Sequence, residues 1–547
     1  MVLLNVLKSK NFLLAIIIFF AVGLRLVNLS AESFRADELL SLDIVLYYQN
    51  QPISEMVDYI NTIEVHPPFY YILLKYWILI FGGGEFAVKF LSVLFGAGTI
   101  ILVYYIAKRW FKDENIALYS AFFTAILPMQ IEFSQEARPY IIFSFFILLS
   151  GFWLIRYLES GEQRYALLYI ISSLFGLYIH YSFALFLIPL VLYWPLHYLI
   201  FEKSLSISEI KKWFIAHSAI ALGFWPQLDS FLYKAFFLRR YELYDLSSAV
   251  YAGNSKDITF FESVVNQLIW TTSHVSFKQI EILAVFIFKI ALIGSLLYLI
   301  IKHKERLSAA LVKYGRFLLF CAWMAFAPMI LFLFSPYSEG YRRTYESHLL
   351  ASSIFIIFII SFLIAQLDRK QQFFLASLFF ISLVSYTANV LGNDSYWDPD
   401  HRLKEVAGVI NENYQPGDIV IHQYTYGRTD VNHYLRPELS ALTLIPYHLY
   451  DWQLDFFATR ETLGLLENET MMRERILKDK STKEEQDKKM RYIMKQYRPQ
   501  RVWTTFLNDD LNLQMWMMGN GWKKGIGSAE PLMPVQLYIK DTGEAEK

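Results

Sequence analysis

The chain has 547 residues, of which 55% are hydrophobic, 18% aromatic and 18% charged, and its mean hydropathy is positive. Globular proteins average roughly 45–50% apolar and about 25% charged residues, so this composition excludes a disordered chain and argues against a wholly soluble one. Fifty Lys and Arg residues balance fifty Asp and Glu residues, which leaves no basic field to bind nucleic acid. The single cysteine, Cys321, excludes an intramolecular disulfide framework and a cysteine-based zinc site.

Hydrophobic runs divide the chain into two parts. A membrane span needs about 20 mostly apolar residues, and such runs recur up to about Gly392 but not beyond it. We therefore predict a polytopic α-helical membrane domain over residues 1–392 and a soluble α/β domain over residues 393–547. Within the first part, residues 30–85 are predicted to be a long outer loop with interfacial helices.

Eleven spans are expected from the hydropathy, at about 11–29, 86–107, 115–133, 139–157, 164–181, 182–201, 213–232, 281–301, 316–335, 347–367 and 371–391. The apolar run Pro67–Phe81 is short, begins with two prolines and ends at three glycines, so we predict an interfacial or re-entrant helix there instead of a span. With eleven spans, Lys and Arg gather in the inner loops. This predicts a multi-pass protein of the cell membrane with a cytoplasmic amino terminus and an extracytoplasmic C-terminal domain.

The C-terminal part alternates helical and strand patterns. Gln415-Pro416-Gly417-Asp418 is a turn signal between a predicted helix and a short apolar run. The predicted helices cover His401–Tyr414 and the charge-rich stretch Thr470–Gln496, and the predicted strands cover Ile419–Gln423, Arg501–Phe506 and Val535–Ile539. No P-loop or dinucleotide fingerprint occurs here.

The residues with useful chemistry all fall on the predicted outer face. A carboxylate beside another can act as a general base, and arginines at the headgroup level can grip a phosphate bidentately. The candidates are Arg25, Asp37, Glu38, His66, Glu136, Arg138, His180, Tyr181, Arg342 and Arg343. This combination predicts transfer of a group from a lipid phosphate to a hydroxyl or amine outside the membrane, with membrane lipids as neighbours.

The order of these motifs resembles the glycosyltransferase C superfamily, in particular the relatives of protein O-mannosyltransferases and of lipid A aminoarabinose transferases. The resemblance rests on motifs that follow one another on the same topology: Arg25 near the end of the first helix, Asp37-Glu38, His66-Pro67-Pro68 and Gln135-Glu136-Ala137-Arg138-Pro139-Tyr140. It covers residues 10–200 well and the later helices loosely.

That resemblance implies an inverting glycosyltransferase, which moves a sugar from a polyprenyl monophosphate to a protein, lipid or glycan acceptor. It implies that Asp37 is the general base and that Glu38 orients or tunes it. Arg138 and one of Arg342 and Arg343 would then contact the phosphate, with His66 bonding substrate or capping its helix. No cofactor is expected, and the sequence offers no constellation that supports a divalent cation.

Other interpretations stay open at this point. Asp37 and Glu38 can serve only the amino end of an amphipathic helix, where acids complement the helix dipole. Arg25 can have a structural role, Arg138 can be an interfacial anchor, and His180-Tyr181 fits an interfacial aromatic belt. A transporter or flippase for a lipid-linked or anionic solute is the alternative function, since ionisable residues near membrane helices also mark pathways.

Overall fold

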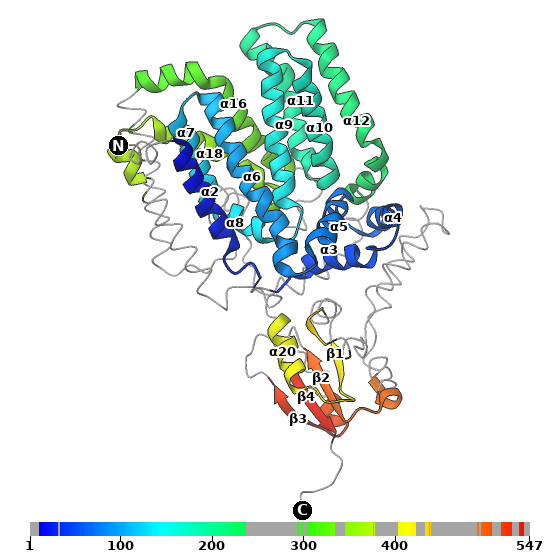
Figure 1. Cartoon of the computed structure of the whole chain (residues 1–547). Helices are drawn as coiled ribbons and strands as arrows, with labels where there is room; N and C mark the ends of the chain where they lie inside the picture. The colour runs from blue at the N-terminus through cyan, green and yellow to red at the C-terminus, as the bar shows by residue number, and fades with distance from the viewer. Residues whose placement is uncertain are drawn as a thin grey trace, which may run out of the picture. The chain divides into compact units, whose positions relative to one another are not determined.

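The computed structural model describes two compact units of the chain, and each is considered by itself (Figure 1). The first comprises residues 1–29 and 48–396, and the second comprises residues 30–47 and 397–547. The structure describes residues 10–30, 33–236, 294, 298, 304–333, 345–375, 377, 403–422, 433–436, 438, 490–491, 494–505, 516–527 and 535–540. Residues 30–47 belong to the second unit, and the domain boundary expected at residue 392 stays a prediction.

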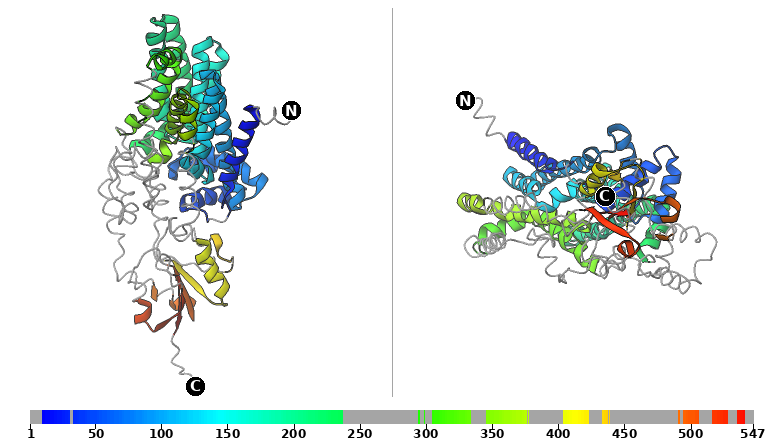
Figure 2. Two further views of the ribbon diagram at one scale, coloured as in Figure 1. Left: turned by 90° about the vertical axis from the view of Figure 1, so that its left-hand side faces the viewer. Right: turned by 90° about the horizontal axis from the view of Figure 1, so that it is seen from below.

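The first unit is a bundle of apolar helices, most of which run side by side (Figures 1 and 2). Its helices are α2 (Lys10–Leu26), α4 (Ile53–Ile63), α5 (Phe69–Phe81), α6 (Glu85–Phe111), α7 (Glu114–Ile126), α8 (Pro128–Gln135), α9 (Tyr140–Ser160), α10 (Gln163–Ile179), α11 (Phe183–His197) with the π-turn η1 (Tyr198–Glu202), α12 (Ile207–Phe236), α16 (Lys304–Leu333), α17 (Tyr345–His348) and α18 (Leu350–Ala365). The chain is a multi-pass membrane protein.

Among the described residues, four helices are long and apolar enough to span a bilayer, and α7 with α8 makes a fifth if this bent pair counts as one span. The four lie in α6, α9, α11 with η1, and α16. At 1.5 Å per residue, the 27 residues of α6 extend about 40 Å. The predicted spans 281–301 and 371–391 fall largely outside the described residues, so the total of eleven stays a prediction.

Two apolar segments are not single straight spans, and only the first of them was predicted to be a span. The predicted span 115–133 is α7 followed by α8, with a bend of 56° between them. The bend lies at Leu127-Pro128, where the proline begins α8 and cannot continue the hydrogen-bonding of α7. The run Pro67–Phe81 forms α5, which has 13 residues, too few to cross a bilayer of ordinary thickness.

Large aromatic side chains fill the interior of the bundle. The fully buried Trp110 of α6 packs on Phe317 and Phe320 of α16 and on Phe358 of α18. Small residues let other helices approach closely: a Cβ placed on Gly176 of α10 would collide with the Phe183 ring of α11. Such small residues at helix contacts are typical of packing in membranes, where apolar burial does not drive association.

The second unit contains α3 (Ala36–Tyr47), α20 (Leu403–Asn413) and a four-stranded sheet with strand order β1-β2-β4-β3. The strands are β1 (Ile419–His422), β2 (Arg501–Thr505), β3 (Trp522–Gly527) and β4 (Val535–Lys540). β1 and β2 are parallel, while β4 is antiparallel to β2 and to β3. This unit thus contains both helices and a sheet, and β3 is an addition to the predicted strands.

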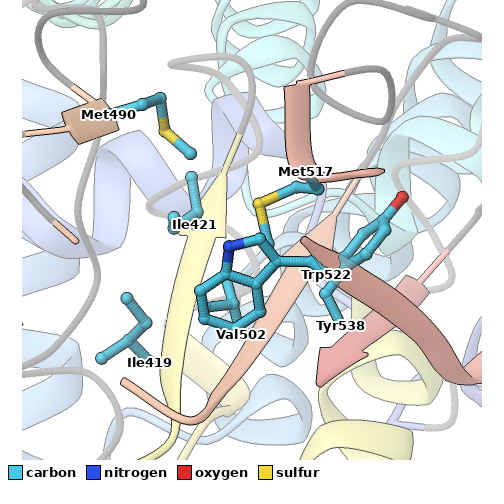
Figure 3. Packing of buried hydrophobic residues seen from close by; sticks show 7 residues of the cluster. All are labelled: Ile419, Ile421, Met490, Val502, Met517, Trp522 and Tyr538. Carbon is cyan, nitrogen blue, oxygen red and sulfur yellow. The ribbon is translucent and has the colours of Figure 1, made fainter. Parts of the chain in front are cut away.

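Both faces of this sheet are covered. One face contributes to a cluster of buried side chains, shown in Figure 3: Ile419, Ile421, Met490, Val502, Met517, Trp522 and Tyr538. Because successive residues of a strand point to opposite faces, Val420, Trp503 and Leu537 lie on the other face, where they are also buried. Asp418 at the start of β1 accepts from Trp503 Nε1 at 2.9 Å and pairs with Arg501 at 3.2 Å.

Candidate functional site

The helical unit gathers polar side chains at helix ends on one side of the bundle. His66 precedes Pro67-Pro68 at the start of α5, and Arg138 precedes Pro139 at the start of α9. A residue before proline is held out of the helical conformation, so each motif places a polar side chain just outside a new helix. His180 lies in extended conformation at the end of α10, before α11 begins.

These residues meet in a buried cluster around His66. His66 Nδ1 lies 2.8 Å from Glu64 Oε1 and 3.2 Å from Arg138 Nη2. Because arginine only donates hydrogen bonds, the carboxylate is the partner that accepts from this ring nitrogen. Glu64 Oε1 also accepts from the backbone N–H of Val65 at 3.0 Å. Glu64, His66 and Arg138 are all less than one-tenth exposed.

The charges of this cluster act on Glu64. Burial alone would raise the pKa of its carboxyl, but the hydrogen bond and charge of His66 and the nearby Arg138 and Lys234 outweigh burial and lower the pKa to about 2. Glu64 is therefore ionised at neutral pH. A buried carboxylate that holds Nδ1–H fixes the ring orientation and the tautomer of His66.

Further aromatic and imidazole rings surround His66. The His180 ring packs edge-on against the His66 ring, with centroids 4.8 Å apart, and stacks on Phe143 at 4.7 Å. The His348 ring lies 5.2 Å from His180, and Tyr140 lies 5.5 Å from His180. Four segments of the first unit thus contribute to one cluster: α4–α5, the start of α9, the α10–α11 turn and α17.

His180 has a defined tautomer and an unused donor. Its Nδ1 accepts from the backbone N–H of Ser182 at 3.0 Å, so the neutral ring carries its proton on Nε2. Nε2 is buried and has no hydrogen-bond partner among the described parts of the chain. A buried donor without a partner costs about 1–3 kcal/mol, and the side chain is only 3% exposed. Such a donor is suited to a ligand atom.

The other predicted residues of this unit are placed differently. Tyr181 Oη donates to Gln227 Oε1 of α12 at 3.1 Å, so its hydroxyl joins the α10–α11 turn to α12. Glu136 is buried in the α8–α9 connection, two positions before Arg138. Arg342 and Arg343 lie outside the described residues.

Arg25 is fully buried near the end of α2, at the α7–α8 bend. It donates to Ala125 O at 2.9 Å, to Gln130 O at 3.3 Å and to Ser134 Oγ at 3.1 Å. A charged group in a span is costly unless such acceptors surround it. The bend exposes backbone carbonyls at the end of α7, and Arg25 satisfies one of them.

Asp37 and Glu38 begin α3 in the second unit. Glu38 Oε2 accepts from the backbone N–H of Arg35 at 2.7 Å, which is the reciprocal half of a capping box. Glu38 is 1% exposed, whereas Asp37 is exposed. The two neighbouring carboxylates therefore have different environments.

Sequence reasoning left Glu64, Ser182 and His348 out of the candidate residues. Glu64 stands two positions before His66, a spacing with no recognised signal. Ser182 Oγ lies 2.6 Å from His348 Nδ1 and thereby joins two segments 166 positions apart. Only tertiary structure reveals that pairing. In the described ranges no group of His, Cys, Asp and Glu side chains is arranged to hold a metal ion.

Comparison with known proteins adds a family match over part of the chain and a similarity of fold. Residues 65–228 match the family described as dolichyl-phosphate-mannose-protein mannosyltransferase. An uncharacterized protein of Aquifex aeolicus is 29% identical over 174 residues, which cover 30% of this chain and about a third (33%) of that relative's length. The matched family region contains His66, Arg138 and His180, whereas Asp37 precedes it.

The solved structures that resemble the chain include two of ArnT from Cupriavidus metallidurans. The apo structure has a TM-score of 0.59 at 11% identity, with 96% of this chain and 97% of that chain covered. The structure bound to undecaprenyl phosphate has a TM-score of 0.57 at 12% identity, with the same coverage. At this identity the likeness concerns the fold, and it extends over nearly the whole chain.

Proposed function

We propose, from the confirmed resemblance of the chain to the protein O-mannosyltransferases and of its fold to ArnT, that this protein is a membrane glycosyltransferase of the glycosyltransferase C type. It moves a sugar from a polyprenyl monophosphate to an acceptor at the outer face of the membrane and inverts the anomeric centre. A neighbour in fold is described as bound to undecaprenyl phosphate, which supports this donor class.

The observation that carries the proposal is the buried cluster of Arg138, His66 and His180. Arg138 supplies positive charge, and His180 Nε2–H is a donor without a partner in the described parts of the chain. When the bond between the sugar C1 and the phosphate oxygen breaks, the phosphate gains charge. Fixed donors in a water-poor site stabilise that charge without reorganisation, so these residues favour the departure of the phosphate.

The acceptor oxygen forms the new bond to C1 from the opposite face and gives up its proton. We assign this proton to Asp37, an exposed carboxylate that follows the motif order of the family. Glu38, bonded to Arg35 N–H, fixes the start of the helix that bears Asp37. Arg25 is proposed to be structural, because its guanidinium is buried among backbone carbonyls at the α7–α8 bend.

The alternative is a transporter for a lipid-linked or anionic solute. A transporter needs polar groups that continue through the membrane between broken helices at its middle. The buried cluster described here instead lies at helix ends of one side of the bundle, with Glu64 and His180 outside their neighbouring helices. This placement favours an enzyme that acts at one membrane surface over a transporter.

The test is sugar transfer by the purified full-length protein with a panel of polyprenyl-phosphate sugars. Wild type and the exposed-site controls Arg164→Gln and Asp58→Asn should turn over, while Arg138→Gln and Asp37→Asn should lose most activity. Arg164 pairs with Glu162 at the opposite helix ends, and Asp58 is an exposed residue of α4. Equal turnover in all variants would exclude this cluster and Asp37 from the reaction. Solute movement across vesicles without sugar transfer would favour the transporter.

A further inference from the structure

The segment that precedes α3 is hydrogen-bonded to the C-terminal part of the chain. The backbone N–H of Phe34 donates to Tyr434 Oη at 2.8 Å, across 400 positions of sequence. The N–H of Lys404 donates to Ser33 Oγ at 3.1 Å, and Lys404 Nζ donates to Ser30 O at 2.9 Å. Three hydrogen bonds thus hold the residues that precede Asp37.

Apolar contacts accompany these bonds. The Phe34 side chain is fully buried, and its ring meets the His433 ring edge-on with centroids 5.7 Å apart. The ammonium of Lys404 lies 5.6 Å from the centre of the Tyr434 ring, at cation–π distance. Phe34 is therefore anchored through both its backbone and its side chain.

The segment that contains Tyr434 is itself hydrogen-bonded to α20. Asn411 Nδ2 of α20 donates to Tyr434 O at 2.9 Å, and Asn411 Oδ1 accepts from Arg436 N at 3.0 Å. Lys404 belongs to the first turn of α20. In Figure 1, α20 lies beside the sheet, and it contacts β4. Contacts therefore lead from the sheet through α20 to Phe34.

Phe34 lies directly before the first turn of α3, which bears Asp37 and Glu38. Arg35 O accepts from Leu39 N at 2.9 Å, and Arg35 N donates to Glu38 Oε2 at 2.7 Å, so the first turn of α3 begins directly after Phe34. Only Arg35 and Ala36 separate the anchored Phe34 from Asp37. A displacement of Phe34 is therefore transmitted to Asp37 with little chain in which to absorb it.

We propose that residues 397–547 of the second unit, called the C-terminal unit below, hold α3 in position, and that Tyr434 and Lys404 are the positioning residues. They hold the entry of α3 so that Asp37 has a fixed place. This inference rests on the proposed function in one respect, the role of Asp37 as the base. It gives the C-terminal unit a part in catalysis that does not require it to contact either substrate.

The test compares Tyr434→Phe with Tyr538→Phe in the full-length protein. The first change removes the acceptor of Phe34 N–H and keeps the ring. The second removes a buried hydroxyl that has no hydrogen-bond partner in the part of the chain that the structure describes. We expect amide exchange in residues 33–39 to become about fivefold faster in Tyr434→Phe and to stay unchanged in Tyr538→Phe. Lys404→Met should act in the same direction as Tyr434→Phe.

Kinetics provide the second readout. A misplaced base slows the chemical step, so kcat should fall about tenfold in Tyr434→Phe while KM for the lipid donor changes less than about twofold. Unchanged exchange, or faster exchange with unchanged kcat, would overturn the proposal. If Asp37→Asn retains full turnover, the base assignment fails, and the exchange difference then decides alone whether the C-terminal unit holds α3.

Discussion

At the scale of single residues, the tautomer of His180 is a property of the cluster that the sequence could not indicate. A histidine followed by tyrosine at a helix end fits an aromatic belt, and nothing in its sequence context indicates a tautomer. The structure defines one, because Ser182 N–H occupies Nδ1 at 3.0 Å and leaves the proton on Nε2. The neighbouring Tyr181 takes the bridging role to α12 instead.

This tautomer leads to a paired substitution. The amide of asparagine can replace the Nδ1 acceptor near Ser182, whereas the longer glutamine can replace the Nε2–H donor. If that donor binds the charged phosphate, His180→Asn should lower kcat/KM about ten- to a hundredfold, since a hydrogen bond to a charged group contributes about 1.5–3 kcal/mol. His180→Gln should retain a larger share. Steady-state transfer assays measure both, and a more active Asn variant would contradict the assignment.

The pKa of Glu64 gives a pH prediction. It is lowered from 4.5 to about 2 in the folded protein, mainly by His66 and the neighbouring cations acting against burial. A group with a depressed pKa contributes stability that is present above its unfolded value, and this contribution is lost as the pH falls from about 4.5 to about 2. Glu64→Gln should therefore weaken the acid dependence of thermal unfolding in this window. Glu55→Gln, at an exposed position of α4, should leave it unchanged.

At the scale of elements, proline made two helix starts predictable, whereas the start of α8 at Pro128 was missed within the predicted span 115–133. Pro67-Pro68 and Pro139 begin α5 and α9 as the sequence indicates, and the turn at Gln415–Asp418 separates α20 from β1 as expected. The order of polar motifs also indicated that His66 and Arg138 share one side of the membrane. Their contact through a single ring nitrogen was not predictable, because no local pattern encodes an approach across 72 positions.

β3 shows where local pattern was insufficient. Trp522-Lys523-Lys524-Gly525-Ile526-Gly527 contains two glycines and adjacent lysines, which are unfavourable in strands. The segment is extended because it pairs antiparallel with β4 at the edge of the sheet, next to an irregularity between Lys524 and Gly527. Lysine suits an edge strand, since it discourages pairing with another chain. Tertiary pairing therefore outweighs the propensity of the segment.

Close packing of α6 provides a prediction at this scale. A Cβ on Gly96 would lie 2.9 Å from Ser134 Cβ and 3.1 Å from Arg25 Nε, so both the bend and its arginine would have to shift. Gly96→Ala should cost about 1–3 kcal/mol of stability, measured as thermal unfolding in detergent. Gly98→Ala in the same helix meets only Phe145 at 3.5 Å, an ordinary contact, and should be neutral or stabilising. Equal stability of the two variants would contradict the close packing of Gly96 against Ser134 and Arg25.

At the scale of the whole molecule, the placement of basic residues bears on how the helical bundle is oriented in the membrane. The end opposite the His66 cluster has basic residues paired with glutamates, including Lys108 with Glu114, Arg109 with Glu159, Arg164 with Glu162 and Arg316 with Glu202. Basic residues favour the cytoplasmic side of a membrane. We therefore predict that the buried cluster lies at the outer side of the membrane, where the proposed sugar transfer would take place.

This orientation can be measured because the chain has one cysteine, Cys321, which is buried in α16 and should not react with a membrane-impermeant maleimide. Asp58→Cys places a thiol at an exposed position of α4, and Glu162→Cys places one in the α9–α10 turn, where the native side chain is 45% exposed. In intact cells Asp58→Cys should be labelled and Glu162→Cys should not, whereas both should react after permeabilisation. The reverse pattern would place the buried cluster on the cytoplasmic side and contradict transfer to an extracytoplasmic acceptor, whatever the identity of the sugar.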